Sequence, residues 1–164
     1  MNVDVLYSRL RRGVERFLSF RPRTKSEIEK YILRKISSLK DLELNTHEIL
    51  EDLLKEYSQQ ITSDEDFIKW WIEERAFFKP KSKNILKYEL LQKGVSRDVL
   101  DTFFEAYVSD EIAQINRFFE RRGIKIDDHL NDKEYMKKLV AKLQRRGFSY
   151  SDIKNAIDQS IKRK

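Results

Sequence analysis

The segment FRPRTKSEIEKYILRKI (20–36) aligns without a gap on FKPKSKNILKYELLQKG (78–94), at an offset of 58 residues. The identical pairs are Phe20/Phe78, Pro22/Pro80, Lys25/Lys83, Leu33/Leu91 and Lys35/Lys93. The chain has 2 prolines among its 164 residues, and both occupy the same position of this repeat. Self-similarity at a fixed spacing indicates a repeat architecture, in which neighbouring units bury a shared core.

A second alignment extends the repeat toward the C-terminus. At an offset of 53 residues, Gly94 falls on Gly147 and Leu90 falls on Leu143. The two offsets together predict one continuous array of three units, covering residues 1–60, 61–107 and 108–164.

Apolar residues recur every three or four positions along almost the whole chain, which is the helical period. With 4 glycines and 2 prolines, the chain also has few sites for the tight turns of a hairpin-rich fold. We therefore predict an all-α protein of three tandem three-helix units that stack into an elongated, curved rod. The periodic segments are 3–19, 28–36, 49–57, 67–78, 86–91, 99–104, 112–119, 135–143 and 153–161.

The proline segment has a physical role in each repeat. A proline one or two residues before a helix keeps the preceding chain extended and ends the earlier helix. Thr24 and Ser82 are then expected to cap the helices that follow. Phe20 and Phe78 precede these caps, where an apolar side chain often packs to fix the direction of the helix.

Basic charge recurs with the repeat. Residues 21–40 have seven Lys or Arg and two acids, whereas residues 79–97 and 133–146 each have six and one, so each segment carries +5. Residues 41–66 carry −8 and residues 98–111 carry −5, within a net charge of +6. The simplest interpretation of these basic segments is that they are charged helix faces exposed to solvent. The recurrence instead favours a row of positive patches that suits a polyanion such as DNA, or an acidic protein groove.

The sequence lacks the usual signatures of catalysis, cofactor binding and metal binding. Cysteine is absent, which excludes disulfides and thiolate chemistry. His47 and His129 are far apart in the sequence, and we expect both to be solvated. The acids Asp64, Glu65 and Asp66 fit a helix start, where they favour the macrodipole, better than a metal site. We expect no enzyme activity, no cofactor and no metal.

No apolar run approaches the ~20 residues that a bilayer requires, and the N-terminal segment has charges inside its apolar pattern. We therefore expect a cytoplasmic protein that has no membrane partner. Of the adjacent Trp70 and Trp71, helical geometry places one in the core and the other partly outside.

The stretch DEDFIKWWIEERAFFKPKSKNILKYELLQKGVSRDVLDTFF (64–104) resembles the core of the RecX family of recombinase regulators. The matching features are Asp64-Glu65, Phe67, Arg75, Lys79-Pro80-Lys81 and Lys93-Gly94-Val95-Ser96. Residues 23–28 and 145–150 are similar to the opening and closing signatures of the family. Residues 37–45 and 123–132 depart from its pattern, as a longer loop and an insertion.

This resemblance implies three tandem three-helix units that bind the RecA recombinase in the helical groove of its filament on single-stranded DNA. Such a protein, acting in DNA repair, recombination and control of the SOS response, mainly inhibits filament growth, ATP hydrolysis and strand exchange. We expect a monomer whose contact with single-stranded DNA is weak and electrostatic. The candidate docking residues are Arg21, Arg23, Lys25, Lys79, Lys81, Lys83, Lys138, Lys142, Arg145 and Arg146.

Two other functions stay open at this point. One is a stand-alone, sequence-independent DNA- or RNA-binding module that needs no recombinase. The other is an enzyme, because the absence of known motifs does not exclude chemistry.

Overall fold

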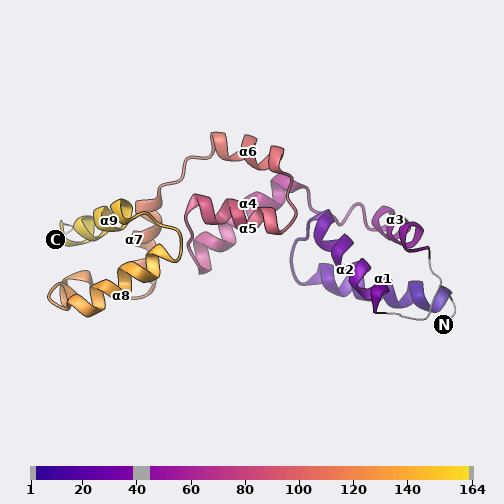
Figure 1. Cartoon of the computed structure of the whole chain (residues 1–164), viewed down its shortest axis with the longest axis horizontal. Coiled ribbons are helices and arrows are strands. Elements are labelled where there is room, and N and C mark those ends of the chain that lie inside the picture. Colours follow the sequence, from indigo (N-terminus) through magenta and orange to yellow (C-terminus); the bar gives the residue numbers. More distant parts are fainter. Residues whose placement is uncertain (1–2, 39–44, 163–164) are drawn as a thin grey trace. The chain divides into compact units, whose positions relative to one another are not determined.

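A computed structural model describes residues 3–38 and 45–162 of the chain. Within these ranges it contains nine α-helices, one 3-10 turn and no strand, which confirms the predicted all-α class (Figure 1). The elements are α1 (Val3–Ser19), α2 (Lys25–Ser37), α3 (Thr46–Glu56), α4 (Asp64–Phe78), α5 (Lys83–Gln92), α6 (Arg97–Ala106), α7 (Glu111–Arg121), η1 (Ile126–His129), α8 (Lys133–Gln144) and α9 (Tyr150–Lys162).

Contacts divide the described chain into two compact units. The first comprises the described residues of Met1–Trp70 with Leu90–Asp101, and the second comprises Trp71–Glu89 with the described residues of Thr102–Lys164. Helices α4, α5 and α6 therefore contribute residues to both units. The boundaries 1–60, 61–107 and 108–164, and the curved rod, stay predictions.

In the first unit, α2 packs against both α1 and α3. The helical period of the sequence accounts for this core, because each helix buries residues that are three or four positions apart. Beside the core, the rings of Phe17 and Tyr31 stack with their centroids 4.5 Å apart. The buried core residues are Leu6, Leu10, Val14, Ile28, Ile32, Ile36, Ile49, Leu53 and Tyr57.

In the second unit, α9 packs against α7, α8 and η1. The 3-10 turn η1 lies inside the predicted insertion, where sequence periodicity indicated no element, and Ile126 anchors it in the core. The buried core residues are Ile115, Phe118, Phe119, Ile126, Leu139, Leu143, Phe148, Ile153 and Ala156.

The predicted caps of the repeated helices are present. The Thr24 hydroxyl accepts a hydrogen bond from the Glu27 N–H at 3.2 Å, and the Ser82 hydroxyl accepts one from the Ile85 N–H at 3.4 Å. Both caps are buried, with exposed fractions of 0% and 2%. A cap at a helix start is usually solvated, so their burial indicates that another segment covers each one.

The covering segment is a glycine turn from later in the chain. Thr24 Oγ1 donates a hydrogen bond to the Lys93 carbonyl oxygen at 2.7 Å. In the second unit, the Ser82 N–H donates to the Arg146 carbonyl oxygen at 3.0 Å. We call each such contact a corner joint: a proline corner (22–26 or 80–84) against a glycine turn (93–95 or 146–148).

Each corner joint requires its glycine for two reasons. Gly94 has φ +81° and Gly147 has φ +89°, in the left-handed region that other residues avoid. A Cβ on Gly94 would also collide with the Ser26 side chain, and one on Gly147 would collide with Ser82 and Ile85. The glycine therefore permits both the turn and its close approach to the corner.

The predicted packing of Phe20 and Phe78 ahead of the caps is wrong. Their exposed fractions are 72% and 63%, so both rings face solvent. Each phenylalanine lies four residues before its cap, whereas the apolar residue that packs on a helix start usually directly precedes the cap.

Replacement of the joint glycine tests this geometry. We expect Gly94→Ala to lower the free energy of unfolding by about 2–5 kcal/mol, because backbone strain of about 1–2 kcal/mol adds to overpacking of about 1–3 kcal/mol. The matched control is Gly123→Ala. Gly123 also has a positive φ, but an added Cβ would have no neighbour within 4 Å, so the cost should be about 1–2 kcal/mol. Urea unfolding followed by circular dichroism measures both, and equal costs would contradict a joint that depends on close approach.

Candidate docking surface

The predicted docking cations fall into an exposed group and a half-buried group. The exposed group comprises Lys25, Lys79, Lys138, Lys142 and Arg145. The half-buried group comprises Arg21, Arg23, Lys81, Lys83 and Arg146. Each side chain of the half-buried group contacts other residues of the protein. These internal contacts limit which cations are exposed for a partner.

Arg21 forms an ion pair that stabilises the first corner joint. Its guanidinium donates to both carboxylate oxygens of Glu27, at 2.6 and 2.9 Å, and Lys93 Nζ lies 3.3 Å from the same carboxylate. Only 12% of the Glu27 side chain is exposed. Burial raises the pKa of Glu27, but the hydrogen bonds and positive charges of Arg21 and Lys93 outweigh it, so that its pKa is lowered. Our sequence reasoning did not single out Glu27, although it lies in the repeat.

Arg23 packs inside the first unit rather than facing a partner. Its guanidinium lies 3.7 Å from the centroid of the Phe17 ring, and its Nε donates to the Phe17 carbonyl oxygen at 3.1 Å. Burial lowers the pKa of Arg23, and the positive charge of Arg21 lowers it further. The contact with the ring face is a cation–π interaction, so Arg23 acts as a structural residue.

A docking role for Lys83 requires an exposed side chain, but Lys83 is half-buried. Its Nζ donates to the carbonyl oxygens of Phe104 and Tyr107, at 2.7 and 3.3 Å. These carbonyls lie at the C-terminal end of α6, where backbone acceptors have no partner within the helix and a cation is favourable. Lys83 therefore caps α6.

Lys81 is also half-buried rather than exposed. Its Nζ lies 3.9 Å from a carboxylate oxygen of Glu89, and 24% of its side chain is exposed. The same carboxylate accepts hydrogen bonds from Arg75 Nε at 2.7 Å and from Trp71 Nε1 at 3.0 Å. Lys81 thus extends a polar cluster that links α4 to α5.

Arg146 completes the second corner joint. Its Nη1 donates to the Pro80 carbonyl oxygen at 3.1 Å, and its guanidinium lies 4.8 Å from the centroid of the Phe118 ring. Burial lowers the pKa of Arg146, and the neighbouring charge of Arg122 lowers it further. The structure therefore brings together parts of two predicted basic segments, 79–97 and 133–146, whose contact the sequence analysis did not predict.

The exposed group is the part of the prediction that a partner can reach. Lys138 and Lys142 of α8 and Arg145, which directly follows the helix as its C-cap, are all exposed, at the i, i+4, i+7 spacing of one helix face. Lys138 lies 3.3 Å from Glu134, but 74% of its side chain remains exposed. Such a surface pair is weak, so its lysine can exchange Glu134 for an anion of a partner.

The paired tryptophans behave as predicted, and one of the two histidines does not. Trp71 is buried and Trp70 is half-buried. His47 is exposed, as expected, and lies 3.4 Å from Glu51. His129 is not fully solvated, because its ring stacks on Tyr135 with the centroids 3.8 Å apart.

Within residues 3–38 and 45–162, no three or more histidine, aspartate or glutamate side chains gather closely enough for a metal ion. None of the helices in those ranges is both long enough and apolar enough to cross a membrane.

The fold and the repeated corner joints define an all-helical protein made of three-helix repeats. Residues 63–102 match the family model described as RecX, second three-helix domain. A protein of Chlorobium limicola, named Regulatory protein RecX, is 30% identical over 142 residues, which cover 87% of this chain and 83% of the relative. The chain therefore belongs to the RecX family.

Two further comparisons agree with this assignment. A Bacillus velezensis protein, also named Regulatory protein RecX, is 28% identical over 151 residues, which cover 91% of this chain and 54% of the relative. This chain thus spans about half the length of several relatives. The crystal structure of RecX from Lactobacillus salivarius matches with a TM-score of 0.60 and 20% identity, covering 94% of this chain and 96% of that chain. This last comparison supports the fold.

The structural role of Lys83 can be separated from surface charge. We expect Lys83→Met to lower the free energy of unfolding by about 1–3 kcal/mol, because carbonyl oxygens at the end of α6 lose a charged donor. Lys79→Met removes the same charge from an exposed position on the same corner and should cost under about 0.5 kcal/mol. Thermal or urea unfolding compares the two, and equal stability would show that Lys83 caps nothing.

The Glu27 ion pair predicts a dependence of stability on pH. Because the folded pKa of Glu27 is lowered, its contribution is present above the ordinary glutamate pKa and is lost as the pH falls through the folded value. At neutral pH we expect Glu27→Gln to cost about 3 kcal/mol, and this cost should shrink in acid. The control is Glu29→Gln on the same helix, whose partner Lys25 lies 3.8 Å away and is 66% exposed. Its cost should stay under about 0.5 kcal/mol at every pH. A constant gap between wild type and Glu27→Gln would contradict the prediction.

Proposed function

We propose that this chain regulates filaments of the RecA recombinase on single-stranded DNA, mainly by inhibiting their growth, ATP hydrolysis and strand exchange. The observation that carries the proposal is membership of the RecX family, whose relatives are named regulatory proteins. The protein would act as a monomer and without chemistry of its own. DNA repair, recombination and the SOS response are the processes in which such regulation takes place.

The exposed cations supply a physical means of docking. Lys79, Lys138, Lys142 and Arg145 of the second unit are solvent-facing, and Lys25 of the first unit is 66% exposed. Individually, such charges contribute little to affinity, but several contacts on one chain act together through effective concentration. Charge complementarity also raises the rate of encounter with an acidic or phosphate-lined surface. The half-buried group would support this surface by fixing the corners.

The test compares a preformed RecA filament with naked single-stranded DNA. A filament regulator should prefer the filament at physiological salt and suppress its ATPase at substoichiometric amounts. A stand-alone DNA- or RNA-binding module should instead show no preference for the filament, and its affinity should fall steeply with salt. An unchanged ATPase in the presence of excess protein would contradict the proposal.

A charge-reversed variant locates the docking surface. We expect Lys138→Glu, Lys142→Glu and Arg145→Glu together to weaken ATPase inhibition at least tenfold, since three contacts of about 0.5–1 kcal/mol each become unfavourable. The matched control is Lys55→Glu, Lys154→Glu and Lys162→Glu, which reverses three exposed charges on α3 and α9. Helical circular dichroism should be unchanged in both. Equal inhibition by the two variants would assign the effect to net charge rather than to the α8 face.

A further inference from the structure

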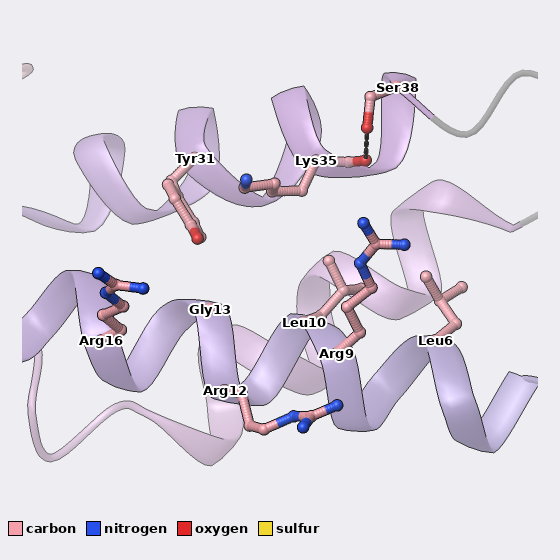
Figure 2. Close-up of a pocket in the computed structure, with 9 residues that line it drawn as sticks. All are labelled: Leu6, Arg9, Leu10, Arg12, Gly13, Arg16, Tyr31, Lys35 and Ser38. Carbon is pink, nitrogen blue, oxygen red and sulfur yellow. Dashed lines mark hydrogen bonds between the residues drawn. The ribbon is translucent and has the colours of Figure 1, made fainter.

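A basic depression lies in the first unit, between α1 and α2 (Figure 2). Its volume is about 430 Å³. Four cations line it, Arg9, Arg12 and Arg16 from α1 and Lys35 from α2, and no acidic residue does so. None of these four belongs to the docking residues expected from the sequence. We call this depression the α1–α2 basic groove.

The cations of the groove are available to a ligand. Arg9 and Arg16 point from α1 toward α2, and Lys35 lies along α2 on the facing side, whereas Arg12 points away (Figure 2). In the part of the chain that the structure describes, no carboxylate forms an ion pair with Arg9, Arg16 or Lys35. By contrast, Arg11 on the same helix is paired with Glu56 at 2.9 Å. Among the described residues, a carboxylate thus pairs with Arg11 of α1, and none pairs with Arg9, Arg16 or Lys35 of the groove.

The centre of the groove adds a neutral donor. The Tyr31 side chain reaches from α2 toward Gly13 of α1, and a Cβ on Gly13 would lie 2.7 Å from its hydroxyl oxygen. Glycine inside a helix costs about 1 kcal/mol relative to alanine, and here it makes room for the hydroxyl. Among the described residues, none forms a hydrogen bond with that hydroxyl. A ligand in the groove therefore meets cations and an O–H donor together.

The dimensions of the groove indicate the class of ligand. Arg9 and Arg16 are seven residues apart, which is about 10 Å along a helix, so a single small anion cannot reach both. Leu6 and Leu10 also line the groove, but their exposed fractions are 1% and 3%, so the groove offers a ligand mainly its cations. The guanidinium fork matches phosphate oxygens, and a nucleic-acid strand presents phosphates at regular short intervals.

We propose that the α1–α2 basic groove binds consecutive phosphates of single-stranded DNA, with Arg9, Arg16 and Lys35 as the contacts. The inference rests on one part of the proposed function, the weak contact with single-stranded DNA, and it assigns that contact to a site in the first unit. It does not require the recombinase. In this proposal, the exposed cations of α8 bind the filament, and the α1–α2 basic groove binds the DNA strand.

The experiment uses naked DNA and the full chain. Fluorescence anisotropy of a labelled oligothymidine measures affinity over a series of salt concentrations, for wild type and for Arg9→Gln, Arg16→Gln and Lys35→Gln together. We expect at least a tenfold loss of affinity at low salt. The slope of log affinity against log salt should also fall by about 2, since each phosphate contact on a single strand contributes about 0.7. The control variant Lys55→Gln, Lys154→Gln and Lys162→Gln removes the same charge and should keep the wild-type slope.

Other outcomes decide against the proposal. If the groove variant keeps the affinity and slope of wild type, or if the two variants lose equally, the groove is not the site. Competition by ATP or inorganic phosphate at concentrations similar to the strand's phosphates would assign the groove to a small anion instead. If the triple variant does not fold, the single variant Arg9→Gln should still lower the slope by about 0.7. Suppression of filament ATPase, measured on the same preparations, tests the proposed function separately.

Discussion

The fold depends on a hydroxyl-bearing cap that a glycine turn covers. Thr24 caps α2 and also donates to the Lys93 carbonyl, and Ser82 caps α5 while its N–H donates to the Arg146 carbonyl. A buried cap must satisfy its polar atoms within the protein, and the turn carbonyl supplies the required acceptor. The approach is close enough that only glycine fits at Gly94 and Gly147. Small three-helix repeats bury little core alone, so such joints between distant segments secure what local packing cannot.

The corner joints also explain why only some of the Lys and Arg side chains are exposed for contact with a partner. A cation near a corner finds carbonyls, aromatic faces or Glu27 within reach, and burial there favours binding inside the fold over binding a partner. Arg21, Arg23, Lys83 and Arg146 are used in this way. Lys138 and Lys142, farther along a helix, remain exposed, although Lys138 lies near Glu134 and the Nζ of Lys142 lies 5.7 Å from the centroid of the Phe118 ring. The net charge of a segment therefore overstates what its surface presents.

The sequence predicted the helices and the caps because both follow from local patterns: apolar residues at the helical period, and a hydroxyl just before a helix. It could not predict the corner joints, because Thr24 and Lys93 are 69 positions apart and no pattern in either segment names the other. The burial of Lys83 was not predicted for the same reason, because the carbonyl oxygens that its Nζ contacts lie at the end of α6, which is distant in the sequence. The predicted packing of Phe20 and Phe78 was wrong because each lies four residues before its cap, too far for the usual contact with the helix start. The basic groove was missed because the charge analysis of the sequence covered segments from residue 21 onward, and Arg9, Arg12 and Arg16 lie before them.

The two corners differ in the charges that lie at and beside them. At the repeat offset of 58, Glu27 of the first corner corresponds to Ile85 of the second, and Arg21 corresponds to Lys79. The first corner is thus neutralised internally by a carboxylate that binds Arg21 and Lys93. The second corner has the apolar Ile85 at the position of Glu27. Arg146 instead contacts the Pro80 carbonyl oxygen and the Phe118 ring. Lys79, next to the second corner, is exposed, as are Lys138, Lys142 and Arg145 of the same unit, whereas the first unit exposes Lys25 and the cations of the α1–α2 basic groove. Segments of equal net charge can thus expose different cations, because carboxylates such as Glu27 and Glu89, carbonyl oxygens and aromatic rings bind some of the cations inside the fold.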